Sequence, residues 1–193
     1  MDFAYNDEQK EIIKVVRDLV EKEIVPYAGE MDETGKLHEG LLEKLAAQGL
    51  LGVAIPEEFG GAGLDAITIA AIYEELGKGC AGVATTVAAN ALASYPVIIA
   101  GNDDQKKRYF DIINQDNLAA FALTEPGTGS DAGSVSTRAV KTEDGKGYIL
   151  NGTKCFITNG ALAEVFVVFA NTRKTGGIRG LTAFIVRKGT PGF

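Results

Sequence analysis

The spacing of apolar residues changes near position 117, and this change constrains the fold more than any other feature of the sequence. Before it, apolar residues recur with the period of an amphipathic helix. After it, Gly, Thr and Val dominate and the apolar period shortens to two, as in half-buried strands. Helices first and strands later favour an α+β fold with segregated units. We expect a helical domain over residues 1–116 and a β domain over residues 117–193.

The expected helices of the first unit begin at residues whose side chains can cap free backbone N–H groups. Three such starts are Asn6 or Asp7, Asp65 and Asn102. A shorter amphipathic helix is expected over residues 41–46, with Gly49 ending it. The uncharged run 79–102 is long enough to span a bilayer. It carries several polar residues and a proline, so we expect a buried helix of a soluble bundle.

Composition and charge exclude several classes of function. The formal net charge of −7 argues against nucleic acids and anionic membranes as partners. Cys80 and Cys155 lie far apart, and His38 is the only histidine, so we expect no metal site and no Ser-His or Cys-His pair. The first residues lack the basic start and apolar core of a signal peptide. We therefore expect a cytoplasmic protein.

The second unit reads as short strands joined by turns. Expected strands cover residues 118–123, 136–140, 148–150, 154–158, 165–170 and 181–186, with a polar loop over 172–177. The Asp144-Gly145 pair marks a hairpin turn between the second and third of them. The last strand would have no partner beyond it, and an uncovered edge of this kind is an association hazard. We expect the β domain to be incomplete and the native protein to continue.

Two turns in the β unit carry the residues best suited to hold a ligand. In residues 121–131 an apolar run ends at Thr124, and one Pro and two Gly follow at once. Such a turn exposes N–H groups and hydroxyls to a planar or anionic ligand, since glycine has no Cβ to keep it away. Residues 154–160 repeat the arrangement, with Thr158 before an Asn-Gly turn.

These two segments, with a weaker third match at residues 49–61, resemble the signatures of the acyl-CoA dehydrogenase family. The resemblance covers essentially the whole chain. It implies an N-terminal all-α helical bundle followed by a small β-barrel or β-sheet middle domain. It also implies a C-terminal helical domain that is absent from these 193 residues.

The resemblance implies FAD as the cofactor and assigns it a set of contact residues. Phe121, Leu123 and Thr124 would line the flavin ring, Thr158 would lie beside flavin N5, and Phe156 and Ile157 would pack on the ring. Gly129 and Ser130 would approach the cofactor phosphates, and Ser130 also the acyl-CoA substrate. For any one of these residues alone, an ordinary role in a turn is the competing interpretation. Asp131 and Glu125 are expected to have structural roles.

The implied reaction is α,β-dehydrogenation of an acyl-CoA thioester to a trans-2-enoyl-CoA, with hydride transfer to flavin N5. Many relatives carry Trp at the position of Phe156, whereas short-chain bacterial relatives often carry Phe there, so the resemblance favours a short acyl chain. The family's base is usually a Glu of the C-terminal domain, so no catalytic residue is assigned and the isolated chain is expected to be inactive. An electron-transfer flavoprotein as acceptor and a homotetramer or dimer are implied as partners.

Two alternatives stay open at this point. The same turns would serve an acyl-CoA oxidase or an enoyl-CoA reductase, which are related flavoenzymes of different chemistry. The chain could also be an inactive flavin- or CoA-binding fragment or a stand-alone interaction module, since it supplies no base and its sheet is incomplete.

Overall fold

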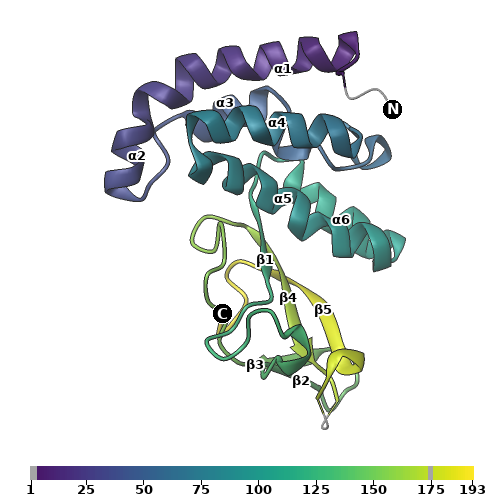
Figure 1. Cartoon of the computed structure of the whole chain (residues 1–193). Coiled ribbons are helices and arrows are strands. Elements are labelled where there is room, and N and C mark those ends of the chain that lie inside the picture. Colours follow the sequence, from purple (N-terminus) through teal and green to yellow (C-terminus); the bar gives the residue numbers. More distant parts are fainter. Residues whose placement is uncertain (1–3, 174–175) are drawn as a thin grey trace. The chain divides into compact units, whose positions relative to one another are not determined.

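A computed structural model describes residues 4–173 and 176–193, which divide into two compact units, Met1–Ala91 and Leu92–Phe193. The helices come first and the strands follow, as Figure 1 shows. The fold is therefore α+β, as the sequence predicts. The division falls within one long helix, and the domain boundary expected at residues 116 and 117 stays a prediction.

Helices make up the first unit, and their starts follow from capping residues. The α-helices described there are α1 (Asp7–Leu19), α2 (Ala28–Thr34), α3 (Leu41–Ala47), α4 (Ala66–Gly79) and the first part of α5 (Ala81–Ala100). Asn6 and Gln9 form a reciprocal capping box at the start of α1, and Asp65 caps α4. Gly49, at φ +69°, follows α3 as predicted. The short helix α2 was not predicted.

A glycine permits close packing between the end of α4 and the π-helical turn Val20–Ile24, which follows α1. Ile24 and Leu76 are fully buried in the core of this unit. A Cβ on Gly79 would lie 2.5 Å from Val20 Cγ1, so a larger residue would push the end of α4 away. Gly79 is the last residue of α4, and its lack of a side chain allows this close approach.

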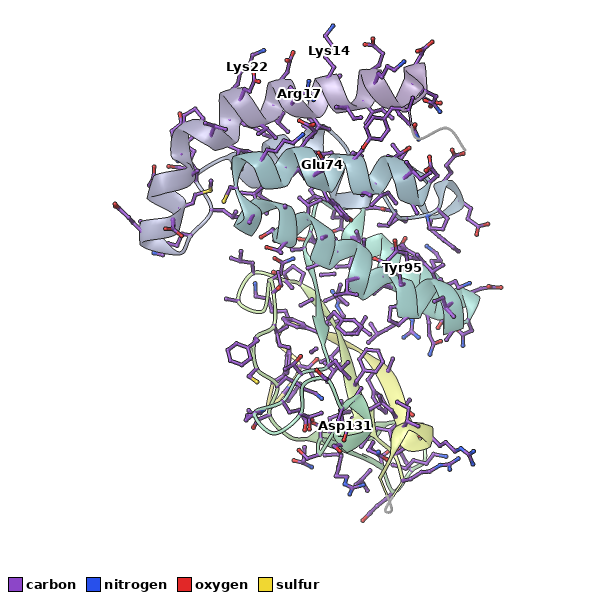
Figure 2. All side chains as sticks on the ribbon, viewed as in Figure 1. Lys14, Arg17, Lys22, Glu74, Tyr95 and Asp131 are labelled. Atoms are coloured by element: carbon purple, nitrogen blue, oxygen red, sulfur yellow. The ribbon has the colours of Figure 1, made fainter. Side chains whose placement is uncertain are left out.

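One buried carboxylate links α1 and α4. Glu75 on α4 accepts hydrogen bonds from Arg17 Nε and Nη2 of α1 at 3.0 and 2.9 Å and from Lys78 Nζ at 2.7 Å. Figure 2 shows Arg17 on α1 and Glu74, the neighbour of Glu75, on α4. The hydrogen bonds from Arg17, with those from Lys78, outweigh burial and lower the pKa of Glu75 to about 2.

We expect the Glu75→Gln variant to lose about 2 kcal/mol of unfolding free energy, since charge-assisted hydrogen bonds are lost. The folded-state pKa of Glu75 is depressed, so its contribution is fully present above pH 4.5 and is lost as the pH falls toward about 2. Urea unfolding at pH 7 and pH 3 measures both effects. Glu74→Gln is the matched control, because Glu74 is exposed and its carboxylate forms a surface ion pair with Lys78. Equal losses in the two variants would contradict this account.

The second unit begins with the rest of α5 and continues through α6 (Asp103–Ile113). Asn102 and Gln105 form a capping box at the start of α6, as the sequence predicts. Ser94 of α5 and Tyr109 of α6, both fully buried, lie 3.3 Å apart at their hydroxyls. Among the described residues, α5 is one helix with the length and apolar composition to cross a membrane, and half of its apolar window is buried.

The strands of this unit form one mixed sheet. They are β1 (Ala119–Ala122), β2 (Arg138–Lys141), β3 (Tyr148–Asn151), β4 (Val165–Asn171) and β5 (Leu181–Arg187). Their order is β1-β4-β2-β3, with β5 also paired to β4. The predicted hairpin of β2 and β3 is antiparallel, as are β4 and β5, whereas β1 runs parallel to β4. β4 is buried along almost its whole length and centres the sheet.

The prediction of a strand over residues 154–158 is wrong. This segment is irregular, with a left-handed backbone at Phe156 (φ +54°) and at Asn159 (φ +63°). Left-handed residues interrupt the extended ladder, so the apolar alternation does not produce a strand here. The polar loop expected over residues 172–177 includes residues 174 and 175, which lie outside the described chain.

Candidate functional site

The two threonine-bearing turns lie side by side in the β unit. Thr124 follows β1, and residues 154–160 precede β4, the parallel neighbour of β1. The Cys155 N–H donates to the Thr124 carbonyl at 3.0 Å, and Asn159 Nδ2 donates to the Ala119 carbonyl at 3.1 Å. The second segment therefore runs along β1 in the opposite direction, with Cys155 beside the end of β1 and Asn159 beside its start.

The first turn is fixed by its own backbone. Glu125 and Thr128 exchange two backbone hydrogen bonds of 3.0 Å, and Thr128 Oγ1 donates to the Ser134 carbonyl at 3.0 Å. A Cβ on Gly127 or Gly129 would meet nothing within 4 Å. These glycines are thus not required by packing within the chain, and the space above them is open to a ligand.

Asp131 has the structural role expected of it. Its carboxylate accepts from the Gly133 N–H at 3.2 Å and from the Ser134 hydroxyl, and it caps the short 3₁₀ turn Ala132–Ser134. A carboxylate used in this way stabilises the turn. Asp131 is therefore a turn residue.

The predicted flavin-contact residues differ in exposure. Phe121, Leu123, Thr124 and Ile157 are half-buried, and Gly129, Ser130, Phe156 and Thr158 are exposed. The Phe121 ring packs on Phe169, with centroids 4.9 Å apart. Within the described chain, the hydroxyls of Thr124, Ser130 and Thr158 make no hydrogen bond to the protein, and none joins Ser130 to residues 156–158. Three hydroxyls are thus available to a ligand.

Phe156 is held in a costly conformation and left uncovered. Its side chain is 93% exposed, and its φ of +54° is unusual for a bulky residue. Such a backbone costs about 1–3 kcal/mol and is typical of functional sites. An exposed aromatic ring beside free hydroxyls suits stacking on a planar, polar-edged ring, so the residues present fit a flavin.

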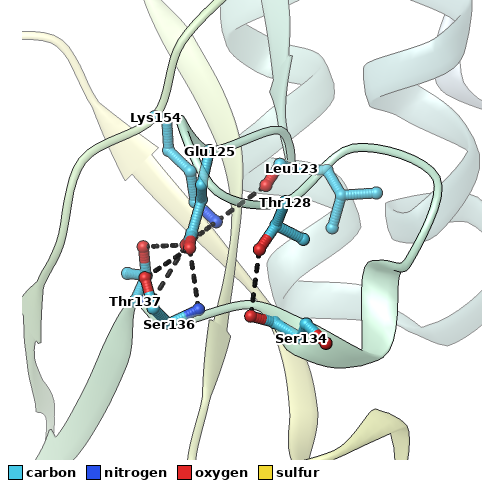
Figure 3. A network of polar contacts seen from close by, with 7 residues as sticks. All are labelled: Leu123, Glu125, Thr128, Ser134, Ser136, Thr137 and Lys154. Carbon is cyan, nitrogen blue, oxygen red and sulfur yellow. Dashed lines mark hydrogen bonds and ion pairs between the residues drawn. The ribbon is translucent and has the colours of Figure 1, made fainter.

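A buried polar network joins the two turns, as Figure 3 shows. Glu125 is 3% exposed as a whole residue, and its carboxylate accepts from the Ser136 N–H at 2.7 Å, the Thr137 N–H at 2.9 Å and Lys154 Nζ at 2.8 Å. The Ser136 hydroxyl and the Thr137 hydroxyl also donate to the Glu125 carboxylate. Burial by itself raises the pKa of Glu125, but the hydrogen bonds from Lys154, Ser136 and Thr137 outweigh it and hold the pKa well below its usual range.

Gly152 packs directly against Thr137, a member of this network. A Cβ there would lie 2.2 Å from Thr137 Oγ1 and 2.7 Å from Thr137 Cα. Only glycine permits this approach, which keeps the exit from β3 against the residues that bind Glu125.

Sequence reasoning gave Glu125 a structural role, which agrees with its contacts, but it missed Ser136, Thr137 and Lys154. No spacing rule links position 125 with positions 136, 137 and 154, because tertiary contacts bring them together. The one available signal was a lysine at the start of the apolar segment 154–158. In the described part of the chain, no three metal-ligating residues cluster.

Comparison with known proteins gives two family matches that together span nearly the whole chain. The model for "Acyl-CoA dehydrogenase, N-terminal domain" matches residues 6–115. The model for "Acyl-CoA dehydrogenase, middle domain" matches residues 120–193.

Curated relatives are similar along the whole chain. An acyl-CoA dehydrogenase of Bacillus subtilis is 42% identical over 188 residues, which are 96% of this chain and 49% of that protein. An acryloyl-CoA reductase (NADH) of Anaerotignum propionicum is 40% identical, over 100% of this chain and 49% of that protein. The chain spans about half the length of the curated relatives it matches.

Solved structures agree with these matches. Butyryl-CoA dehydrogenase from Megasphaera elsdenii has a TM-score of 0.90 and 40% identity, covering 100% of this chain and 51% of that one. Electron transferring flavoprotein of Acidaminococcus fermentans has a TM-score of 0.91 and 39% identity, covering 100% and 50%. Acyl-CoA dehydrogenase complexed with FAD from Bacillus anthracis has a TM-score of 0.84 and 38% identity, covering 97% and 32%. The chain belongs to the acyl-CoA dehydrogenase family, to its N-terminal and middle domains.

Proposed function

We propose that this chain is the N-terminal and middle part of an FAD-dependent dehydrogenase that converts a short-chain acyl-CoA to its trans-2-enoyl-CoA. The observation that carries the proposal is the hydrogen bond from the Cys155 N–H to the Thr124 carbonyl, at 3.0 Å. It places side by side the two turns that bear the free hydroxyls and the exposed Phe156. Solved relatives that hold FAD support the choice of cofactor.

The residues of the two turns have different roles in binding FAD and the substrate. Phe121, Leu123, Phe156 and Ile157 supply apolar contacts to the flavin ring, and Thr124 and Thr158 supply hydroxyls to its polar edge. Gly129 and Ser130, at the open end of the first turn, bind phosphate oxygens and the acyl-CoA. Bound FAD supplies the hydride acceptor of the reaction. We assign no base to this chain for removal of the α proton, and we propose that a carboxylate outside these residues removes it.

The remaining parts of the proposal follow the family. A short acyl chain is supported by relatives named as short-chain specific and butyryl-CoA dehydrogenases. An electron-transfer flavoprotein is the proposed acceptor, supported by the similarity to the Acidaminococcus fermentans structure. A cytoplasmic homo-oligomer is the proposed form of the whole protein.

The experiment is anaerobic reduction of the purified full protein by butyryl-CoA. The protein should carry FAD, absorb in the visible range and lose that absorption when butyryl-CoA is added. A protein that neither retains FAD nor takes it up on reconstitution would reject the proposal. Oxygen consumption without another acceptor would instead identify an acyl-CoA oxidase.

A second candidate is an enoyl-CoA reductase that runs the chemistry in reverse. It is favoured by two similar proteins, the acryloyl-CoA reductase (NADH) and a 3-(aryl)acrylate reductase of Clostridium sporogenes that is 43% identical. Faster turnover of an enoyl-CoA with a reduced donor than of the saturated thioester with an oxidised acceptor would select it.

Removing the exposed aromatic ring should weaken cofactor binding without unfolding the chain. We expect Phe156→Ala to raise the Kd for FAD by about tenfold, because a stacked ring contact is lost. The melting temperature of the apoprotein should not fall, since the side chain is 93% exposed and contacts little of the chain. Fluorescence titration of apoprotein with FAD measures the change. Leu162→Ala, also at an exposed apolar residue of this region, is the control and should leave the Kd unaltered.

A further inference from the structure

The Glu125–Lys154 ion pair is arranged around Thr124. Lys154 Nζ donates to the Leu123 carbonyl at 2.9 Å and to Glu125 Oε1 at 2.8 Å. Leu123 and Glu125 are the residues on either side of Thr124, and the carbonyl of Thr124 itself binds the Cys155 N–H. The segment that carries Thr158 therefore holds Thr124 by both neighbours and by its own backbone.

The pair is buried and fully provided with hydrogen bonds. The side chains of Lys154 and Glu125 are 11% and 2% exposed. Ser136 and Thr137 occupy the remaining acceptor positions of the carboxylate with two N–H groups and two hydroxyls. One carboxylate thus joins three separate parts of the chain, namely the first turn, the two residues just before β2 and the second turn.

Stability alone does not explain a buried ion pair. Well-packed apolar residues of similar volume often stabilise a fold as well, because burying two charges is costly. What apolar residues lack is a choice of partner, whereas the carboxylate and the ammonium form hydrogen bonds of preferred length and angle with particular donors and acceptors. An ion pair of this kind is therefore suited to fixing the relative position of two segments, even where it adds little to the stability of the fold.

We propose that the Glu125–Lys154 pair is a positioning device that fixes the two threonine-bearing turns relative to each other, and so sets the affinity and the hydrogen-bonding environment of the flavin. The inference rests on the proposed function, because it concerns the cofactor that these turns bind. Neither Glu125 nor Lys154 touches the flavin in this role. Both act through Thr124 and through the segment that carries Phe156 and Thr158.

The test compares variants of the full protein loaded with FAD. The double variant Glu125→Gln/Lys154→Met has no buried charge and keeps side chains of similar volume. It should fold, but it should bind FAD at least about tenfold more weakly, as expected when two ligand hydrogen bonds are misaligned. The visible absorption bands of its bound FAD should also shift. Lys154→Arg keeps the charge and the donors, and should restore the Kd to within about threefold of wild type.

Two further variants keep the test decisive. Thr137→Val removes one donor to Glu125 and leaves the ion pair intact, so it should fold even where the double variant does not. It should weaken FAD binding by about threefold and shift the absorption bands in the same sense. Glu75→Gln, in the first unit, is the matched control, because it breaks a comparable carboxylate contact that belongs to the other unit. It should lower stability and leave both flavin readouts unaltered.

The outcomes separate this inference from the proposed function. A wild-type protein that binds no FAD rejects the proposed function itself. A wild type that binds FAD, with a folded double variant or Thr137→Val variant of identical Kd and spectrum, overturns the positioning role and leaves the pair as structural only. Equal changes in the Glu75→Gln control would overturn it too, since loss of stability would then account for them.

Discussion

The Lys154→Met variant is expected to lose about 3–5 kcal/mol of unfolding free energy at pH 7, because the buried Glu125 carboxylate loses its cation. Glu125 is 3% exposed, so water cannot replace the ammonium. Lys154 also donates to the Leu123 carbonyl, and that bond is lost as well. Urea unfolding followed by circular dichroism measures the change.

The size of this loss should depend on pH. The pKa of Glu125 is depressed in the folded state, so its contribution is fully present above its ordinary value of 4.5 and is lost as the pH falls through the folded-state value. The difference between wild type and Lys154→Met should therefore be largest above pH 4.5 and should narrow in more acidic solution. Protonation neutralises the unpaired carboxylate in the variant, which removes the cause of the loss.

Lys146→Met serves as the control for the loss of a lysine. Lys146 is exposed in the turn between β2 and β3, and its replacement should alter stability by less than about 0.5 kcal/mol. If Lys146→Met and Lys154→Met lost similar amounts, or if the loss were independent of pH, the ion pair would not stabilise the β unit.

The second large effect is expected from Gly152→Ala, with a loss of about 3 kcal/mol. The new Cβ would lie 2.2 Å from Thr137 Oγ1 and 2.7 Å from Thr137 Cα. Because the Cα belongs to the backbone, no side-chain rotation relieves the contact, and the exit from β3 must move. Thermal unfolding of the two proteins gives the difference.

Gly127→Ala is the matched glycine control in the same unit. A Cβ at Gly127 meets nothing within 4 Å, and the residue has no left-handed backbone. Its stability should stay within about 1 kcal/mol of wild type, since the change acts mainly on the unfolded chain. A loss in Gly127→Ala as large as in Gly152→Ala would show that close approach is not the cause.

Capping residues predicted the starts of those helices that have a capping side chain directly before their first turn. Asn6, Asp65 and Asn102 begin the helices that the sequence assigned to them. The helix α2 was missed because it follows a π turn and a proline-containing 3₁₀ turn directly and has no cap side chain. Its packing comes from its neighbours, which periodicity does not reveal.

In the β unit, the hairpin of β2 and β3 was predictable because an Asp-Gly turn fixes it locally. The parallel pairing of β1 with β4 was not, because strand order depends on contacts between distant residues. The strand expected over residues 154–158 failed for a related reason. Alternating apolar residues satisfy the pattern of a strand, yet the left-handed Phe156 and Asn159 give the segment another path.

The sequence by itself determined the family, the order of the helical and β units, and the residue types of the two turns, because motifs and periodicity are local properties. Only the tertiary structure decided that these turns lie side by side and that Glu125, Thr137 and Lys154 join them. The physical reason is that a buried carboxylate takes its partners from wherever folding brings N–H groups, hydroxyls and an ammonium within about 3 Å. The separation of these residues along the chain does not reveal that they come into contact.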